Sequence, residues 1–350
     1  MPRVSVLIPT HDHAETLPLA VASVQAQGVA DLEVLICGDG VDDALRTVAA
    51  DLCSADSRIR FFDLPKAPRL GELNRDLVLR QARGRIVCYQ SDDDLWLPGH
   101  LAAMEAALEN ADFAGAMQVN VDADGKVRGH YFDLERPEFL EPWLAWKPNE
   151  FGSWACNGFG LSFAAHRLDA YLRLPEGWST TPAGLPSDQT MWHKFLRQDW
   201  CRARFLRWPV ALHFPAPDRK HWPPGRRAAE LKEWSAIMAS PDGMGRIARD
   251  LLPDLGDRLL RQSLDDRGVR DELAKACGEL EAAHGRAIVE LTAARDRQAA
   301  LESRLAAERS VRLAAERERD ALLSSKARRL TAPLRAAIHA LKRLKSPRDA

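Results

Sequence analysis

The chain has 350 residues, of which 46% are hydrophobic and 28% charged, and its formal net charge is −1 at pH 7. This composition is typical of a soluble globular protein. The nearly balanced charge gives no overall reason to expect a nucleic-acid partner. The length allows one large domain with an appendage, or two domains of ordinary size.

The cysteines and the N-terminal residues bear on where the protein works. The six cysteines stand singly, without a CxxC pair or the short Cys/His spacing of a zinc site, so we expect reduced thiols with structural roles. The N-terminal sequence MPRVSVLIPTHDH has one short apolar stretch that runs into Pro9 and charged residues. It fits neither a signal peptide nor a membrane span, and we expect a cytoplasmic protein.

Four short apolar runs, rich in β-branched residues, alternate with helical patterns over the first ninety residues. Such alternation predicts βαβ units and a parallel sheet with helices on both faces. This part of the chain is therefore expected to be Rossmann-like. The predicted strands are 4–8, 32–37, 59–62 and 85–89, and the predicted helices are 17–28, 44–52 and 70–82.

Polar residues follow three of these predicted strands directly. Pro9 and Thr10 come after the first strand, residues 38–40 (GDG) after the second, and residues 91–94 (SDDD) after the fourth. Ligands of parallel sheets bind at the carboxyl ends of the strands. The three clusters are therefore expected to form one site.

Three consecutive carboxylates, Asp92, Asp93 and Asp94, end a buried strand. Like charges repel, and burying a carboxylate costs free energy unless a cation or hydrogen-bond donors lie next to it. Hard carboxylate oxygens suit Mg²⁺ or Mn²⁺, which proteins hold with one or two carboxylates together with phosphate oxygens. The cluster thus predicts a divalent ion and a diphosphate ligand. The alternative is that Asp94 simply caps a helix that opens at Leu95 or His100.

The stretches VSVLIPTHDHAETLPLAVASVQAQ, LEVLICGDGVDD and GRIVCYQSDDDLWLPGHL lie in this order over roughly the first hundred residues. Together they resemble the nucleotide-sugar half of the family 2 glycosyltransferases, which have the GT-A fold. The resemblance implies a metal-dependent enzyme that transfers a sugar from a nucleoside diphosphate to a hydroxyl group with inversion. Two positions depart from the usual family pattern, because Gly38 replaces a common aspartate and Val41 stands where serine is usual.

The same resemblance implies roles for five residues of the first hundred. Pro9 and Thr10 would form the floor under the nucleotide base, and Asp39 would bind the imide of that base. Asp92 would face the ribose, and Asp93 would bind the Mn²⁺ or Mg²⁺ ion.

Inverting enzymes need one general base that takes a proton from the acceptor hydroxyl. The resemblance implies that this base follows the acidic pair by about a hundred residues, at the start of a helix. The stretch LPSDQTMWHKFL supplies Asp188 there, although an aspartate before an amphipathic run also fits an N-cap. The resemblance further implies a late histidine near the metal or diphosphate. His213 fits this role, and the alternatives are His221 or a buried histidine that binds no ligand.

Nine of the ten tryptophans lie between Phe113 and Trp234. Aromatic faces stack on the apolar faces of sugars, so some of them are acceptor-binding candidates, whereas most tryptophans belong to the core. Trp154 and Trp178 have loop-like surroundings rich in Gly and Pro. We therefore predict these two as the acceptor-binding tryptophans.

The composition changes beyond Asp257 to Leu, Ala, Glu and Arg. Apolar residues from Leu273 to Leu305 recur in alternating steps of four and three, which predicts a long helix and a marginal coiled coil that dimerises. A single charged helix is the alternative. Residues 326–350 carry eight basic residues and one acid, with leucines at helical spacing. This pattern predicts a basic amphipathic helix on an anionic membrane surface, or else a solvated tail.

The predicted fold is α/β: a GT-A, Rossmann-like, mostly parallel sheet flanked by helices, followed by a long helical or coiled-coil region. We expect a nucleotide-sugar half at 1–112, an acceptor half at 113–240, a long helix at 257–325 and a basic tail at 326–350. The acceptor would be a glycan, lipid-linked or protein hydroxyl in surface-glycan synthesis, at the inner face of the membrane.

Two other functions fit the same fold. A nucleotidyltransferase needs a glycine-rich basic loop after the first strand, which PTHDHAETL lacks. A catalytically degenerate GT-A domain would act as a scaffold through its C-terminal helix. The departures at Gly38 and Val41 favour this scaffold, and the presence of Asp39, Asp92, Asp93 and Asp188 argues against it.

Overall fold

The computed structural model describes residues 2–130, 132–145 and 158–263, together with short runs and single positions between 293 and 338. The chain divides into two compact units, Met1–Arg267 and Gly268–Ala350. Among the described residues, no helix combines the length and the apolar character that a membrane crossing requires.

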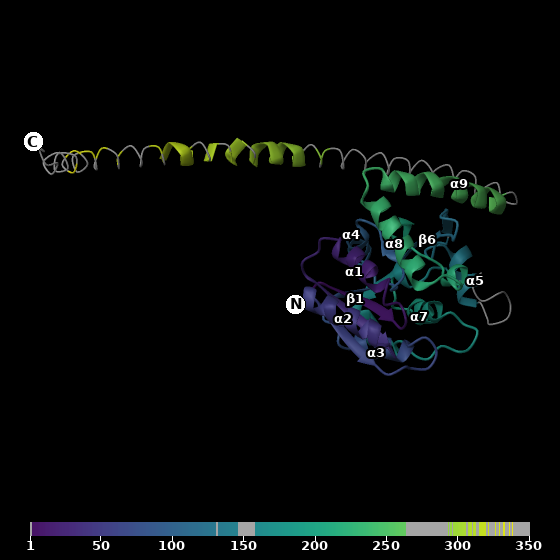
Figure 1. Ribbon diagram of the computed structural model, residues 1–350. Coiled ribbons are helices and arrows are strands. Elements are labelled where there is room, and N and C mark those ends of the chain that lie inside the picture. Colours follow the sequence, from purple (N-terminus) through teal and green to yellow (C-terminus); the bar gives the residue numbers. More distant parts are fainter. Residues whose placement is uncertain are drawn as a thin grey trace, which may run out of the picture. The chain divides into compact units, whose positions relative to one another are not determined.

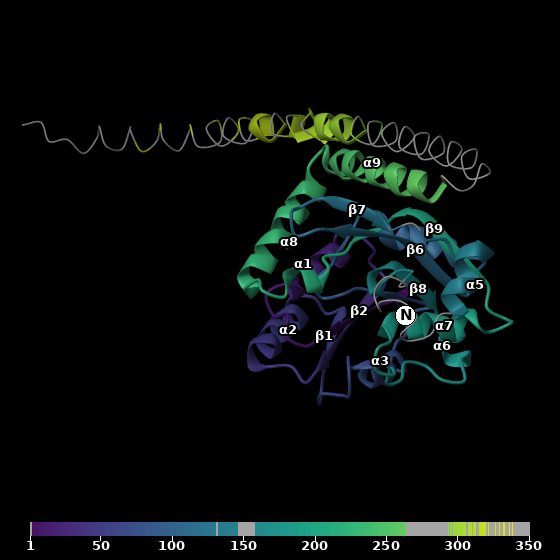
Figure 2. The ribbon, with the colours of Figure 1, turned by 90° about the vertical axis from the view of Figure 1, so that its right-hand side faces the viewer.

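The first unit is built around a mixed β-sheet (Figures 1 and 2). Its strands are β1 (Val4–Thr10), β2 (Leu32–Asp39), β3 (Ile59–Leu64), β4 (Ile86–Tyr89), β6 (Phe113–Val121), β7 (Val127–His130), β8 (Ala164–Arg167) and β9 (Ala203–Pro209). They lie in the order β3-β2-β1-β4-β8-β6-β7, and β9 pairs with β6. The first four strands are parallel, and β8 runs antiparallel to both of its neighbours. A second, small sheet pairs β5 (Leu95–Trp96) with β10 (Ala211–Leu212).

Helices surround the large sheet in both views (Figures 1 and 2). They are α1 (Leu17–Gln25), α2 (Asp43–Ala55), α3 (Glu72–Leu79), α4 (His100–Ala107), α5 (Pro137–Ala145), α6 (Leu168–Arg173), α7 (Ser187–Leu196), α8 (Pro224–Ala239) and α9 (Gly243–Ser263). Because helices cover both faces, the central strands are mostly apolar, and every residue of β2 is buried.

The observed elements confirm the prediction of an α/β fold with a mostly parallel sheet flanked by helices. Each of the four predicted strands is present, and β1 and β2 extend two residues further than expected. The predicted helix at 44–52 is α2, where the Asp42 carboxylate accepts a hydrogen bond from Leu45 N at 2.8 Å as an N-cap. The predicted helix at 70–82 is shorter and forms α3.

The strand register brings the predicted polar clusters together. Thr10 of β1 lies opposite Gly38 of β2, and Leu7 of β1 lies opposite Tyr89 of β4. The carboxyl ends of β1, β2 and β4 therefore lie side by side, with β1 in the middle. The residues that follow these strands meet at one edge of the sheet.

In the second unit, the described positions between 293 and 338 are helical. Two heptad positions, Leu301 and Leu305, lie on this helix and are exposed. The heptad positions from Leu273 to Leu291 and most of the basic tail at 326–350 lie outside the described residues. The helix prediction is confirmed at the described positions, and dimerisation through a coiled coil stays a prediction.

Candidate active site

A pocket of about 380 Å³ lies at the carboxyl ends of β1, β2 and β4. Its lining brings together residues that the sequence analysis predicted from four separate stretches of the chain. Six predicted residues line it, namely Pro9, Thr10, Asp39, Asp92, Asp93 and His213. This gathering confirms that the strand-end clusters meet at one place.

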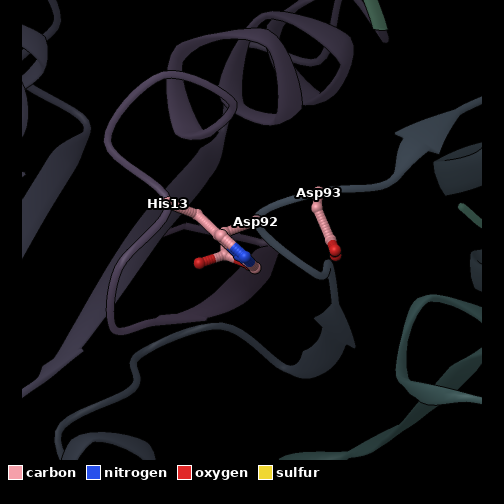
Figure 3. A group of neighbouring side chains, drawn as sticks. All are labelled: His13, Asp92 and Asp93. Atoms are coloured by element: carbon pink, nitrogen blue, oxygen red, sulfur yellow. The ribbon is translucent and has the colours of Figure 1, made fainter. Parts of the chain in front are cut away.

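Three side chains in the pocket form a group suited to a divalent metal ion (Figure 3). His13, Asp92 and Asp93 each offer one ligand atom, and these atoms lie within 4.8 Å of one another. The His13 ring contacts the Asp92 carboxylate, with Nδ1 at 2.8 Å from Oδ1. Ser91 donates a hydrogen bond to Asp93 Oδ1 at 2.7 Å. Carboxylate oxygens and an imidazole nitrogen suit Mn²⁺, and the carboxylates suit Mg²⁺, so these residues fit the predicted ion.

The pKa values of this group indicate that positive charge is favourable at the site. Burial raises the pKa of Asp93, and the neighbouring charges of Asp94 and Asp92 raise it further. Burial alone would lower the pKa of His13, but the hydrogen bond and charge of Asp92, together with the nearby acids, raise it to about 9. The acids around His13 therefore favour positive charge at this place, which a bound metal ion would also supply. The sequence analysis missed His13, although it stands just three residues after the end of β1.

Arg227 also faces the acidic group, from helix α8. Its Nη1 lies 2.8 Å from His13 Nε2, and its Nη2 lies 3.9 Å from Asp93 Oδ2. The guanidinium supplies a positive charge beside the carboxylates. Nothing in the sequence pattern identified Arg227, because it lies far along the chain from the acids that it approaches.

The third acid of the cluster has a different environment. Asp94 is buried and accepts hydrogen bonds from Ser162 Oγ at 2.5 Å, His213 Nδ1 at 2.9 Å and Phe214 N at 3.1 Å. The alternative prediction that Asp94 caps a helix is wrong, since β5 follows it and α4 begins only at His100. Asp94 instead ties the loop after β4 to two later segments of the chain.

Replacing Asp94 with alanine should lower the free energy of unfolding by about 2–4 kcal/mol, because the Ser162 hydroxyl, the Phe214 amide and His213 lose a buried acceptor. Urea denaturation measures this change. The matched control is Asp124→Ala, which removes an exposed acid and should change stability by less than about 0.5 kcal/mol. Equal midpoints for the two variants would contradict the structural role of Asp94.

His213 lines the pocket, as predicted for a residue near the metal. Its Nδ1 contacts Asp94, and this contact leaves Nε2 as the nitrogen available to a ligand. Burial alone would lower its pKa, but Asp94 and more distant acids raise it to about 9. The alternative residue, His221, is exposed. Metal binding by His213 stays a prediction.

Asp39 lies on the wall of the pocket and is held by donors from the next loop. Lys66 Nζ donates to Oδ2 at 2.6 Å, while Asn74 Nδ2 and Ala67 N donate to Oδ1, each at 2.7 Å. Gly71 follows with φ of +80°, and a Cβ there would lie 2.7 Å from Asp39 Cγ. Only glycine fits both demands. Asp39 thus anchors the loop that forms one side of the pocket.

Thr10 and Arg75 have polar atoms in the pocket region without partners among the described residues. Thr10 Oγ1 and Arg75 Nε are buried and make no hydrogen bond there, and both residues line the pocket. Buried polar atoms in folded proteins are normally paired. Both atoms thus lack the partner that buried polar atoms normally have.

Gly38, the first departure from the family pattern, has a local packing reason. A Cβ at this position would lie 2.9 Å from Phe61 Cε2 and 3.1 Å from the Phe62 carbonyl oxygen. An aspartate at position 38 would therefore require the Phe61 ring and the β3 backbone beside it to shift. The next residue, Asp39, is buried beside the pocket.

Asp188 is the second residue of α7. The alternative N-cap prediction is not borne out, since the cap residue is Pro186 and no side chain caps the helix. Burial raises the pKa of Asp188, while the positive charges of Arg75 and His213 act to lower it. Both of these residues line the pocket. Asp188 itself is not among the described residues of the lining.

The two predicted acceptor tryptophans fare differently. Trp178 is buried, donates a hydrogen bond from Nε1 to the Tyr89 hydroxyl at 3.0 Å, and has the Arg75 guanidinium 4.7 Å above its ring. Its faces are therefore not open to a sugar, and the acceptor prediction for Trp178 is corrected to a core role. Trp154 lies outside the described residues.

Comparison with known families now bears on this site. The model of the family described as "Glycosyl transferase family 2" matches residues 5–168. This part of the chain is therefore similar to glycosyl transferase family 2. The matched range contains the whole His13–Asp92–Asp93 group, whereas Asp188, His213 and Arg227 lie beyond it.

Curated relatives match over the same part of the chain. A GalNAc(5)-diNAcBac-PP-undecaprenol beta-1,3-glucosyltransferase of Campylobacter jejuni is 33% identical over 104 residues, which are 30% of this chain and 34% of the relative. The Escherichia coli UDP-Glc:alpha-D-GlcNAc-diphosphoundecaprenol beta-1,3-glucosyltransferase WfgD is 29% identical over 98 residues, which are 28% of this chain and 38% of the relative. The chain thus spans about a third of the length of these relatives.

A solved structure is similar over a longer range. The mannosyltransferase PcManGT from Pyrobaculum calidifontis, in complex with GDP-Man and Mn²⁺, covers 79% of this chain and 80% of its own chain. The two proteins are 17% identical, with a TM-score of 0.43.

Proposed function

We propose that the protein is a metal-dependent, inverting glycosyltransferase that moves a sugar from a nucleoside diphosphate sugar to a hydroxyl group. The observation that carries this proposal is the group of His13, Asp92 and Asp93 in the pocket at the strand ends. The family 2 match over residues 5–168 supports it.

Mn²⁺ or Mg²⁺ is the proposed cofactor. When bound, the ion stabilises the negative charge that develops on the diphosphate as its bond to the sugar breaks. Asp93 and His13 would hold it, with His213 approaching through Nε2. Arg227 lies against the same carboxylates, so its guanidinium adds fixed positive charge where the leaving group carries negative charge.

The donor is proposed to bind along the strand ends. Pro9 and Thr10 form the floor under the base, and the unpartnered Thr10 hydroxyl is free to bind it. Asp39 binds the imide of the base, and Asp92 faces the ribose. Arg75 lines the same pocket with an unpartnered Nε and is placed to bind an anionic part of the donor.

Asp188 is the proposed general base. Inversion requires a carboxylate that accepts the acceptor's proton as the new bond forms on the face opposite the leaving group. Burial raises the pKa of Asp188, and a carboxylate with a raised pKa is a stronger base than an exposed one. Arg75 and His213 help to keep it ionised by their charge.

We infer a glycan acceptor carried on a lipid, and a role in surface-glycan synthesis at the cytoplasmic face of the membrane. The names of two curated relatives, which describe undecaprenol-linked acceptors, support this inference. In the proposal, the basic residues 326–350 hold the protein at the membrane, and the heptad pattern within 257–325 pairs two copies.

A panel of nucleotide sugars tests the proposed function. With Mn²⁺ present, we expect release of nucleoside diphosphate from at least one donor, and at least a tenfold lower rate when EDTA removes the metal. The released diphosphate is measured with a coupled enzyme assay. A thermal shift by the nucleoside diphosphate alone, without turnover of any donor, would favour the degenerate scaffold.

A further inference from the structure

Four leucines of the first unit are exposed and lie on two neighbouring helices. We call them the leucine patch: Leu70, Leu73 and Leu77 on and just before α3, and Leu172 on α6, with exposed fractions of 55%, 42%, 54% and 54%. The two helices are joined where the Tyr171 hydroxyl donates to Asp76 Oδ1 at 2.6 Å.

The exposure of these leucines is not explained by packing within the unit. Helix α3 buries its other face against the sheet, through Val78, Leu79 and the polar residues Asn74 and Arg75. The leucines of the patch therefore form a second apolar face on a short helix that needs only one. Leu73 and Leu77 lie four positions apart and so share one face of α3, and exposed apolar surface on a helix face is typical of an interaction site.

The chain around the patch is strongly basic. Residues 65–85 contain six basic residues and two acidic ones, although the whole chain has a net charge of −1. Of the two acids, Glu72 is buried, and Asp76 pairs with Arg80 at 2.8 Å. Arg69, Arg80 and Arg83 are exposed. The outer surface here therefore combines exposed leucines with exposed arginines.

The patch begins at the rim of the active-site pocket. Leu70 and Arg69 belong both to the pocket lining and to the exposed surface. Whatever binds the leucine patch is therefore held beside the pocket opening.

We propose that the leucine patch docks on an anionic lipid bilayer. Its leucines enter the boundary between headgroups and acyl chains, and the surrounding arginines contact lipid phosphates. A second copy of the chain fits this surface less well, because a symmetric contact would place the same positive charges opposite each other. The docked protein presents its pocket to the membrane surface, independently of the basic tail.

Vesicle binding by the full-length chain tests this proposal. The double variant Leu73→Gln/Leu77→Gln should bind phosphatidylglycerol-containing vesicles roughly tenfold more weakly in co-sedimentation, because two half-exposed leucines no longer insert. The matched control is Leu252→Gln, an equally exposed leucine (40%) on α9, which packs on β7 at the far end of the sheet. It should bind like the parent chain, and circular dichroism checks that both variants are folded.

A probe distinguishes the leucine patch from the basic tail. An environment-sensitive fluorophore on Leu73→Cys should shift to the blue on anionic vesicles, whereas the same probe on Leu252→Cys should not, after subtraction of the labelled parent chain. Equal vesicle binding by the parent and the double variant would overturn the proposal. So would an absent shift at position 73, or a loss of self-association in the double variant while vesicle binding persists, which would mark a dimer interface.

Discussion

Replacing Asp93 with alanine is expected to abolish sugar transfer while leaving the fold intact. Asp93 is buried beside two other acids, and its hydrogen bond comes from Ser91 on the same loop. Its removal relieves repulsion and loses only a long 3.9 Å contact with Arg227 Nη2, whereas Asp94 accepts three hydrogen bonds from later segments. We expect turnover to fall at least about a hundredfold, since the variant lacks a carboxylate that would hold the ion proposed to stabilise the leaving group.

The assay measures nucleoside diphosphate release at saturating Mn²⁺, and urea denaturation measures stability. Binding of Mn²⁺ alone, followed by titration calorimetry, should weaken in the same variant. The control is Asp43→Ala, which removes an exposed acid paired with Arg46 on α2 and should leave all three measurements unchanged. Near-normal transfer by the Asp93 variant would remove this residue from the metal site.

Replacing Asp188 with asparagine should abolish transfer while donor binding persists. The amide keeps the shape of the carboxylate but accepts no proton, so the rate should fall by about 10²–10⁴. Calorimetry with the nucleoside diphosphate and Mn²⁺ measures binding, and initial rates measure transfer. The control is Asp169→Asn on α6, an exposed acid paired with Arg167. Loss of donor binding in the Asp188 variant would move this residue out of the base role.

The pH dependence of transfer should reflect the raised pKa of Asp188. Burial raises this pKa, so the carboxylate becomes protonated at a higher pH than an exposed aspartate does. A base works only when deprotonated, and the rate should therefore fall on acidification, with a midpoint above the ordinary aspartate pKa near 4. A rate that stays flat down to that value would contradict the assignment.

The sequence predicted the parallel part of the sheet well, because strands buried on both faces need continuous apolar runs. It also predicted the position of the pocket, since polar residues that follow parallel strands must meet at one edge. The exact ends were less accurate, and β1 and β2 run on to include Thr10 and Asp39. Strand pairing here continues past the point where the apolar pattern stops.

Other features of the site could not be read from pattern. His13 and Arg227 meet at the acidic group because helix α8 brings Arg227 there. The periodicity of the sequence does not predict this contact. Asp94 looks like its neighbours in sequence, and its three donors, which come from later segments, give it a different role. Trp178 has loop-like surroundings but is buried, because Arg75 and Tyr89 close over it.

The contact between Arg227 and His13 has a consequence for how the protein becomes active during its synthesis. These residues lie 214 positions apart along the chain, and Asp94 is joined to Phe214 across 120 positions. Contacts of such high sequence separation form late, since the loops that they close are long. A nascent chain released before α8 emerges would hold the family 2 segment at 5–168 yet lack one of the groups that close around its acids. The acidic group is thus completed only when about two thirds of the polypeptide has been made.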